Sequence, residues 1–172
     1  MKRIYKNRRI ISLFALSLFL VFLPNYAFTQ THTGDVVSTK PHNEGYFEVI
    51  ASIINANSFE EEGGNIGNEF HLTYWFNHKL GTGLSLTTKS HEGELLYDTA
   101  IIGSWSLAKW MTVNAGPNFS WAGEHREFGI SAYGEIEINF FVIDQIHIGP
   151  VLGVLFGSED EFTHGFHLGF EF

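Results

Sequence analysis

Residues 111–121 read MTVNAGPNFSW and alternate apolar and polar residues with a period of two. The odd-numbered positions, from Met111 to Trp121, are apolar, whereas the even-numbered positions are Thr, Asn, Gly, Asn and Ser. Successive side chains of a β-strand point to opposite faces, so this pattern predicts a strand with one apolar and one polar face. The apolar spacings of three and four that indicate a helix are not seen here.

The same period of two recurs on both sides of this stretch. It predicts further strands at 46–57, 70–76, 80–87, 95–107, 128–140, 146–156 and 162–172. The predicted connections are 58–67, 77–80, 90–93, 108–110, 123–127, 142–145 and 157–161, of which the first is the longest. Strands joined this tightly must be antiparallel, because a parallel return needs a crossover of a dozen or more residues. The sequence therefore predicts an all-β domain of eight antiparallel strands over residues 44–172.

The side chains on the two faces of these strands differ in size as well as in polarity. Most of the Phe and Trp residues lie on the apolar face, and the interior of an eight-stranded barrel has little room for them. The other face is rich in Gly, Ser, Thr, Asn, His and Glu, and its acids would be costly in hydrocarbon. We therefore predict an up-and-down transmembrane β-barrel with its apolar face outside. The polar candidates for the lumen are Glu48, His71, Lys89, Asp98, Tyr133, Glu135, Glu137, His147, His167 and Glu171. A secreted soluble β-sandwich or a lipocalin-like binding protein shares this period and remains an alternative.

The beginning of the chain has the pattern of a cleavable signal peptide over residues 1–27. A basic start is followed by an apolar run at 10–23 and a cleavage point after Ala27. The run is shorter than the roughly 20 residues of a membrane-spanning helix, which is the alternative. Residues 28–43 are polar and predict a flexible periplasmic segment. Cleavage leaves five basic residues against 19 acids, a net charge of −14, which argues against nucleic acid as a partner.

The end of the chain, FHLGFEF at residues 166–172, carries a family resemblance. On the basis of this segment, the signal peptide and the strand count, the chain resembles the small, porin-like eight-stranded outer-membrane barrels of the OmpA/OmpX type. The resemblance implies a monomer in the lipid of the Gram-negative outer membrane, with both chain ends in the periplasm. It also implies that the barrel assembly machinery reads an assembly signal formed by Phe166, Leu168, Phe170 and Phe172. His164 departs from the pattern, since alternation would place an apolar residue there.

No motif indicates a catalytic, cofactor or metal site, and the chain has no Cys. One interpretation of His71, His147 and His167, with Glu135 or Glu171, is a metal site. Hydrogen bonding among polar lumen residues is the simpler interpretation.

Some eight-stranded barrels modify lipid A, so an acyl hydrolase or acyltransferase is an alternative function. Its Ser, His and acid could come from Ser90, His91 and Asp98, or from His125 with Ser131. A small-solute channel is another alternative, although eight strands predict a narrow, plugged lumen. We expect a non-enzymatic structural or interaction protein.

Overall fold

The computed structural model describes residues 45–59, 64–91, 93–123, 126–158 and 160–172. The predicted signal peptide at 1–27 and the predicted periplasmic segment at 28–43 lie outside these ranges. The strands are β1 (Tyr46–Ser58), β2 (Gly64–Trp75), β3 (Leu80–His91), β4 (Glu94–Ala108), β5 (Met111–Ser120), β6 (Gly129–Ile138), β7 (Phe140–Ile143), β8 (Ile146–Gly157) and β9 (Glu161–Glu171). Within the described ranges, no helix is long and apolar enough to cross a membrane.

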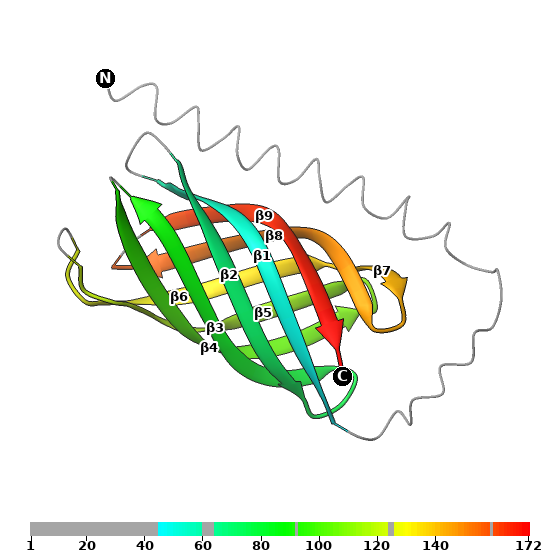
Figure 1. Ribbon diagram of the computed structural model, residues 1–172. Coiled ribbons are helices and arrows are strands. Elements are labelled where there is room, and N and C mark those ends of the chain that lie inside the picture. The colour runs from blue at the N-terminus through cyan, green and yellow to red at the C-terminus, as the bar shows by residue number, and fades with distance from the viewer. Residues whose placement is uncertain (1–44, 60–63, 92, 124–125, 159) are drawn as a thin grey trace, which may run out of the picture. The chain divides into compact units, whose positions relative to one another are not determined.

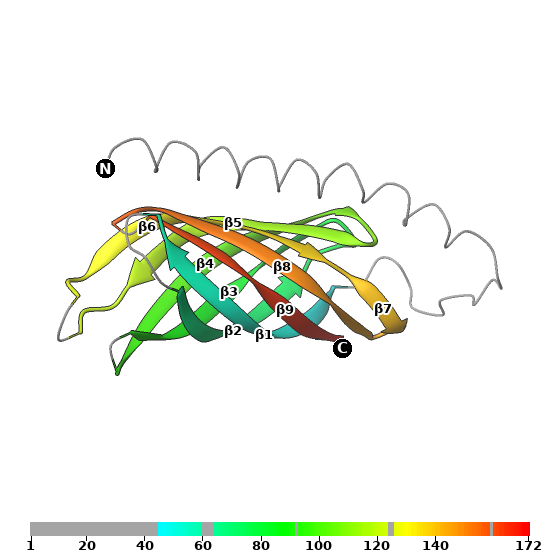
Figure 2. The same cartoon turned by 90° about the horizontal axis from the view of Figure 1, so that it is seen from above.

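The strands form one closed antiparallel barrel (Figures 1 and 2). Strands that follow each other along the chain are paired, as their short connections predict. Closure comes from β1, which pairs with β9 through Glu48 opposite Glu171, and from β6, which pairs with β8. The predicted closed barrel of eight antiparallel strands is therefore confirmed.

Nine segments make eight barrel strands because β7 continues β6. The register against β8 is the same on both sides of the gap: Glu137 pairs with Val151, and Phe140 pairs with Ile148. Pro150 lies opposite the gap and has no backbone N–H to donate to the ladder. The interruption is thus a local loss of pairing within one long strand.

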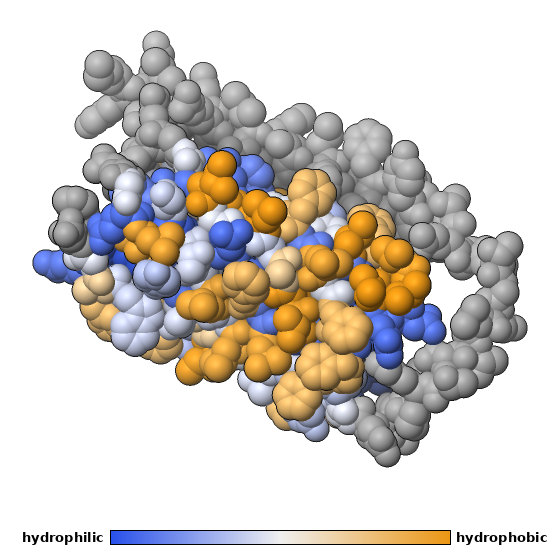
Figure 3. Space-filling view, viewed as in Figure 1, coloured by the Kyte–Doolittle hydropathy of each residue, from blue (hydrophilic) through white to orange (hydrophobic). Residues whose placement is uncertain are grey.

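Burial follows the predicted alternation. On β2, His71 is 2% exposed, whereas the neighbouring Phe70 is 49% exposed. On β5, Thr112 and Asn114 are buried inside the barrel. Apolar side chains gather over the outer surface of the strands seen in Figure 3. The apolar face is outside and the polar face inside, as the sequence predicts.

The interior is less polar than the sequence analysis suggested. Five aliphatic side chains of β1, β4 and β8 are also buried: Ile50, Ile54, Ile102, Val151 and Leu155. They leave β1 with apolar residues on both faces, which explains why its alternation is the weakest in the sequence.

Ile138 corrects the predicted outer row of β6, because it is only 4% exposed. It lies at the gap, where the backbone approaches β8 so closely that a Cβ at Gly149 would overlap the Ile138 carbonyl. Glu137, Ile138 and Asn139 are all buried there, so the period of two is lost over these three residues.

The connections fall at two ends of the barrel. The start of β1 and the end of β9 share one end with the β2–β3, β4–β5 and β7–β8 turns, since Phe47 and Phe172 exchange backbone hydrogen bonds there. At the other end the β1–β2 connection is 59–63, shorter than the predicted 58–67, because Asn57 still pairs with Gly64. The longest connection is instead 121–128, between β5 and β6.

Candidate functional site

The candidate site is the barrel interior, which holds three groups of polar side chains. We call them the loop-end cluster (Lys89, Asp98, Arg126, Glu161), the central cluster (Glu69, His71, Tyr133, Glu135, Glu137) and the mouth cluster (Glu48, Trp75, His147, His167, Glu171). The mouth cluster lies at the end where β1 begins and β9 ends, and the loop-end cluster lies at the opposite end.

The loop-end cluster consists of ion pairs that join β3 to its neighbour β4 and to β9, which is distant in the sequence. Lys89 Nζ lies 2.9 Å from Asp98 Oδ2 on the adjacent β4 and 2.6 Å from Glu161 Oε2 on β9. Arg126, from the β5–β6 connection, places its guanidinium 3.1 Å from Asp98 Oδ1. Lys89 is 2% exposed and Asp98 1% exposed, so each charge depends on its partners in place of water. The cluster ties three strands and a connection together.

Glu69 of the central cluster is surrounded by hydroxyl donors. Its Oε1 accepts hydrogen bonds from Ser85 at 3.1 Å and from Thr87 at 3.0 Å, both on the adjacent β3. The Tyr133 hydroxyl donates to the same atom at 3.1 Å, from β6 on the opposite side of the barrel. These donors replace water around the buried carboxylate.

His71 lies between three carboxylates. Its Nε2 is 3.4 Å from Glu69 Oε1, and its Nδ1 is 3.3 Å from Glu137 Oε1 and 3.7 Å from Glu135 Oε1. Asn114 Nδ2 donates to Oε1 of both β6 glutamates, at 3.2 Å for Glu135 and 2.9 Å for Glu137. The amide therefore holds the two carboxyl groups side by side, facing the imidazole.

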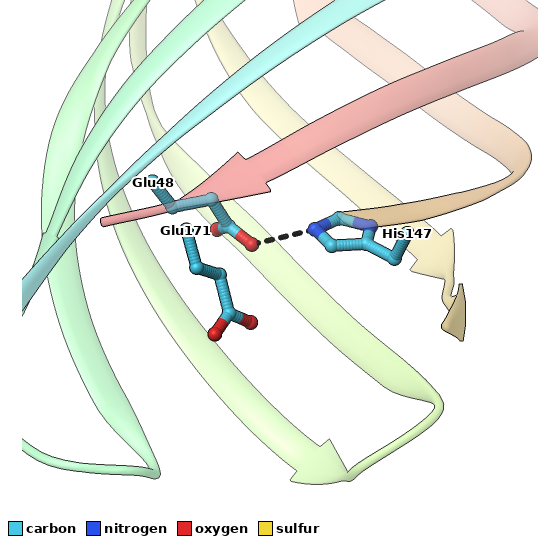
Figure 4. A group of neighbouring side chains, drawn as sticks. All are labelled: Glu48, His147 and Glu171. Atoms are coloured by element: carbon cyan, nitrogen blue, oxygen red, sulfur yellow. Dashed lines mark hydrogen bonds and ion pairs between the residues drawn. The ribbon is translucent and has the colours of Figure 1, made fainter. Parts of the chain in front are cut away.

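The mouth cluster is a chain of hydrogen bonds. Trp75 Nε1–H donates to Glu48 Oε2 at 2.9 Å, and the other oxygen of Glu48 lies 2.8 Å from His147 Nε2 (Figure 4). The second ring nitrogen of His147 is 3.2 Å from His167 Nε2. Glu171 pairs in register with Glu48 and is half-buried. Trp75, Glu48 and the two imidazoles therefore form one continuous network.

Little space remains between these side chains. A cavity of about 10 Å³ lies between the central and loop-end clusters, where Glu69, Tyr133, Lys89 and Asp98 line it. A single water molecule needs roughly 10–15 Å³, so this cavity has room for about one. Beside it, Tyr133 packs with Ala100, Ile102 and Leu155 as an apolar group.

All ten lumen candidates from the sequence have side chains inside the barrel, nine of them buried and Glu171 half-buried. The structure brings His147 and His167 together but places His71 in a different cluster. Within the described ranges, two groups have potential ligand atoms within 4.8 Å of one another: Glu48 with His147 and Glu171, and Glu69 with His71 and Glu135.

Four members of these clusters were not predicted from the sequence: Glu69, Glu161, Trp75 and Arg126. Glu69 and Glu161 share the lumen parity of His71 and His167, so extending each predicted strand backwards would have found them. Asn114, which donates to Glu135 and Glu137, lies on the predicted polar face of its strand, but nothing in its pattern distinguishes it from its polar neighbours. Trp75 also lies at a lumen position of its strand, but its aromatic side chain is of the type expected on the apolar face. Arg126 lies in a connection without periodicity, and no sequence signal indicated it.

The residues proposed for acyl chemistry do not assemble in the described part of the chain. Ser90 is exposed on the outer face of β3, whereas Asp98 is buried inside and paired with Lys89. His91 Nδ1 lies 3.4 Å from Asn65 Oδ1.

In the second proposed set, Ser131 Oγ lies 3.0 Å from Ser158 Oγ inside the barrel end. His125 lies outside the described residues.

No protein-family model and no curated protein sequence matches the chain. Solved structures do. The N-terminal β-barrel domain of Pseudomonas aeruginosa OprF matches with a TM-score of 0.56 and 14% identity, over 75% of this chain and 100% of that one. Ail, the attachment invasion locus protein of Yersinia pestis, matches with a TM-score of 0.51 and 11% identity, over 77% and 100%. The chain therefore has the fold of the small eight-stranded outer-membrane β-barrels.

Proposed function

We propose that the protein is a monomeric outer-membrane barrel of structural or interaction type, with a narrow and plugged lumen. The observation that carries this proposal is the inversion of polarity between the two faces. Large apolar side chains stand outside, with Ile53, Ile66 and Phe166 each 67–72% exposed, while charged side chains are buried inside. A continuous apolar outer surface is unstable in water and suits hydrocarbon.

Cell fractionation with gel mobility tests the location. The protein should appear in the outer-membrane fraction and migrate differently before and after boiling, because a folded barrel resists detergent. We further propose that residues 1–27 are removed on export, so the intact mass should match a chain beginning near residue 28. A protein recovered wholly from the soluble periplasm would contradict the location.

The short connections support a limited role in external recognition. If the chain ends face the periplasm, as the resemblance implies, the external connections are 59–63, 92–93, 121–128 and 158–160. Such loops offer little surface to a protein partner. The partners we propose are outer-membrane lipid and, during assembly, the machinery that reads the final strand.

The filled interior supports a closed lumen. Eight strands enclose a space that side chains can fill, and the three clusters occupy it together with the aliphatic residues. In planar lipid bilayers we expect the purified barrel to give no stable conductance of nanosiemens size. A steady conductance of that size would show that the clusters leave an open path.

The opposite orientations of Ser90 and Asp98 support a non-enzymatic role. Lipid A from cells with and without the gene should carry the same acyl chains by mass spectrometry. A difference in acylation would contradict this part of the proposal.

A further inference from the structure

The titratable side chains of the lumen form a row from one end of the barrel to the other. The mouth cluster lies where β1 begins, the central cluster follows it, and the loop-end cluster lies at the opposite end. Buried aliphatic residues such as Ile50, Ile102 and Leu155 fill the space beside the row. Chains of Asp, Glu and His inside membrane-spanning proteins are the usual elements of proton relays. The lumen therefore combines an interior closed to solutes with a row of groups that exchange protons.

In the mouth cluster, the direction of each hydrogen bond follows from the Glu48 carboxylate. A carboxylate only accepts, so His147 donates to Glu48 from Nε2 at 2.8 Å (Figure 4). Nδ1 of the neutral His147 ring then accepts from His167 Nε2 at 3.2 Å. His167 Nδ1 keeps a lone pair to which no described group donates. A proton that arrives at His167 Nδ1 can leave the pair at Glu48, because an imidazole accepts a proton on one nitrogen and releases one from the other.

In the central cluster, one imidazole connects two carboxyl groups in the same way. His71 Nε2 lies 3.4 Å from Glu69 Oε1, and His71 Nδ1 lies 3.3 Å from Glu137 Oε1. The ring can take a proton from Glu69 on one nitrogen and release one to Glu137 from the other. Glu69 is on β2 and Glu137 is on β6, so this transfer crosses the lumen.

The cavity of about 10 Å³ connects the central cluster to the loop end. Glu69 and Glu161 both line it, and a water molecule of the size that fits there can pass protons between the two carboxyl groups. Glu161 is 8% exposed, and Glu171 is half-buried next to Glu48. Each end of the row therefore has a carboxyl group that bulk water reaches.

One step of the row has no direct contact between the described side chains. It lies between Glu137 and His167, and the charge of Glu137 acts on the His167 imidazole across this interval. The His167 ring or the Glu137 side chain must turn to close the interval for each proton. We therefore expect this step to limit the rate of transfer.

We propose that the barrel conducts protons, and excludes larger ions, along this row between Glu161 and Glu48. The inference rests on the proposed membrane location. A proton enters from water at one end, each group accepts one proton and releases another, and one proton returns to water at the other end. The imidazoles then carry their protons on the opposite nitrogens, and they turn back before the next transfer. The pH difference or the voltage across the membrane sets the direction.

Proton flux into lipid vesicles tests this inference. The purified barrel is reconstituted into vesicles that contain a pH-sensitive dye, and a potassium gradient with valinomycin drives protons inward. Gel mobility before and after boiling verifies that the inserted protein is folded. Vesicles with the barrel should acidify several-fold faster than vesicles without protein, whereas dyes for sodium and chloride should report no flux that depends on the protein.

His167→Gln and His164→Gln are a matched pair of variants on β9. His167 is 3% exposed inside the barrel, whereas His164 is exposed on the outer face of the same strand. Gln does not accept a proton at one atom and release one from another. His167→Gln should therefore lower the protein-dependent proton flux at least roughly tenfold, and His164→Gln should leave it unchanged. His147→Gln interrupts the next step of the row and should have the same effect as His167→Gln.

A folded, inserted wild-type barrel with no proton flux above that of protein-free vesicles would overturn the inference and leave the membrane location intact. Equal proton flux in the wild type and in His167→Gln would overturn the path, and sodium or chloride flux through the wild type would show an open pore instead of a relay. A chain that does not insert into vesicles would contradict the proposed location. If the His167 and His147 variants do not fold, the ion selectivity of the wild type decides the question.

Discussion

Gly169 sets the position of the His147 imidazole. The two residues are opposite each other on β8 and β9, and a Cβ at position 169 would lie 2.1 Å from a ring carbon of His147. The ring can lie across β9 and meet Glu48 on β1 because position 169 has no side chain. One glycine thus permits a hydrogen bond between strands that are not neighbours.

Gly169→Ala should therefore destabilise the barrel by roughly 1–3 kcal/mol, since the added methyl group displaces the imidazole from Glu48. Urea unfolding followed by gel mobility measures the change. Gly103→Ala is the matched control, because the nearest atom to its added Cβ is 3.7 Å away. Equal stability of the two variants would contradict the role given to Gly169.

Lys89 is a second residue on which the stability of the barrel interior depends. It is buried between Asp98 and Glu161, at 2.9 and 2.6 Å. Lys89→Met removes the cation and leaves carboxylates in a low-dielectric space, so we expect a loss of roughly 3–5 kcal/mol in unfolding free energy. Lys79→Met, at an exposed turn position, should change stability little. A Lys89→Met barrel as stable as the Lys79→Met barrel would argue against a stabilising loop-end cluster.

At the scale of the strand, alternation in the sequence was enough to assign pairing and the two faces. It placed Phe70 outside and His71 inside correctly, because a strand that separates two environments must alternate. Alternation failed at positions where other effects determine the burial of a residue or the bounds of a strand. Ile138 is buried because alternation is lost at the gap between β6 and β7, where its neighbours Glu137 and Asn139 are buried too. β2 begins at Gly64 because pairing with β1 continues beyond the apolar pattern.

The clusters were less predictable than the strands. Alternation gives the face of a residue but not its height in the barrel or its neighbours across the lumen. It therefore could not tell that His71 meets Glu69 and Glu135 while His147 meets Glu48. Those contacts depend on register and on closure between β1 and β9.

The final strand, β9, closes the barrel. Phe172 exchanges backbone hydrogen bonds with Phe47 at 3.0 and 2.8 Å, and its ring stacks on Phe47 and Phe170. Phe172→Ala should lower the amount of folded protein in the outer membrane several-fold, because it removes both the stacking and the proposed assembly signal. Immunoblots of unboiled membrane samples measure the folded fraction.

Phe156→Ala is the control for Phe172→Ala. Phe156 is 53% exposed on the outer surface and Phe172 is 56% exposed, so both variants remove a similar apolar contact. If the two variants assemble equally well, the last residue has no special part in assembly.

At the scale of the whole molecule, the barrel has its apolar residues outside and its charges inside, which is the reverse of the arrangement in a water-soluble protein. Native tryptophans lie on both faces of the barrel wall: Trp105 is 56% exposed on the outer face of β4, and Trp75 is 2% exposed inside. The central claim, that lipid contacts the outer face and not the interior, can therefore be tested with natural fluorophores.

The most direct measurement is fluorescence quenching by brominated phospholipids in variants that keep a single tryptophan, with the other three changed to Phe. We predict strong quenching of Trp105 and little quenching of Trp75, because bromine on the acyl chains quenches only the residues it contacts. Equal quenching of both, or no quenching of Trp105 in a folded barrel, would contradict the account.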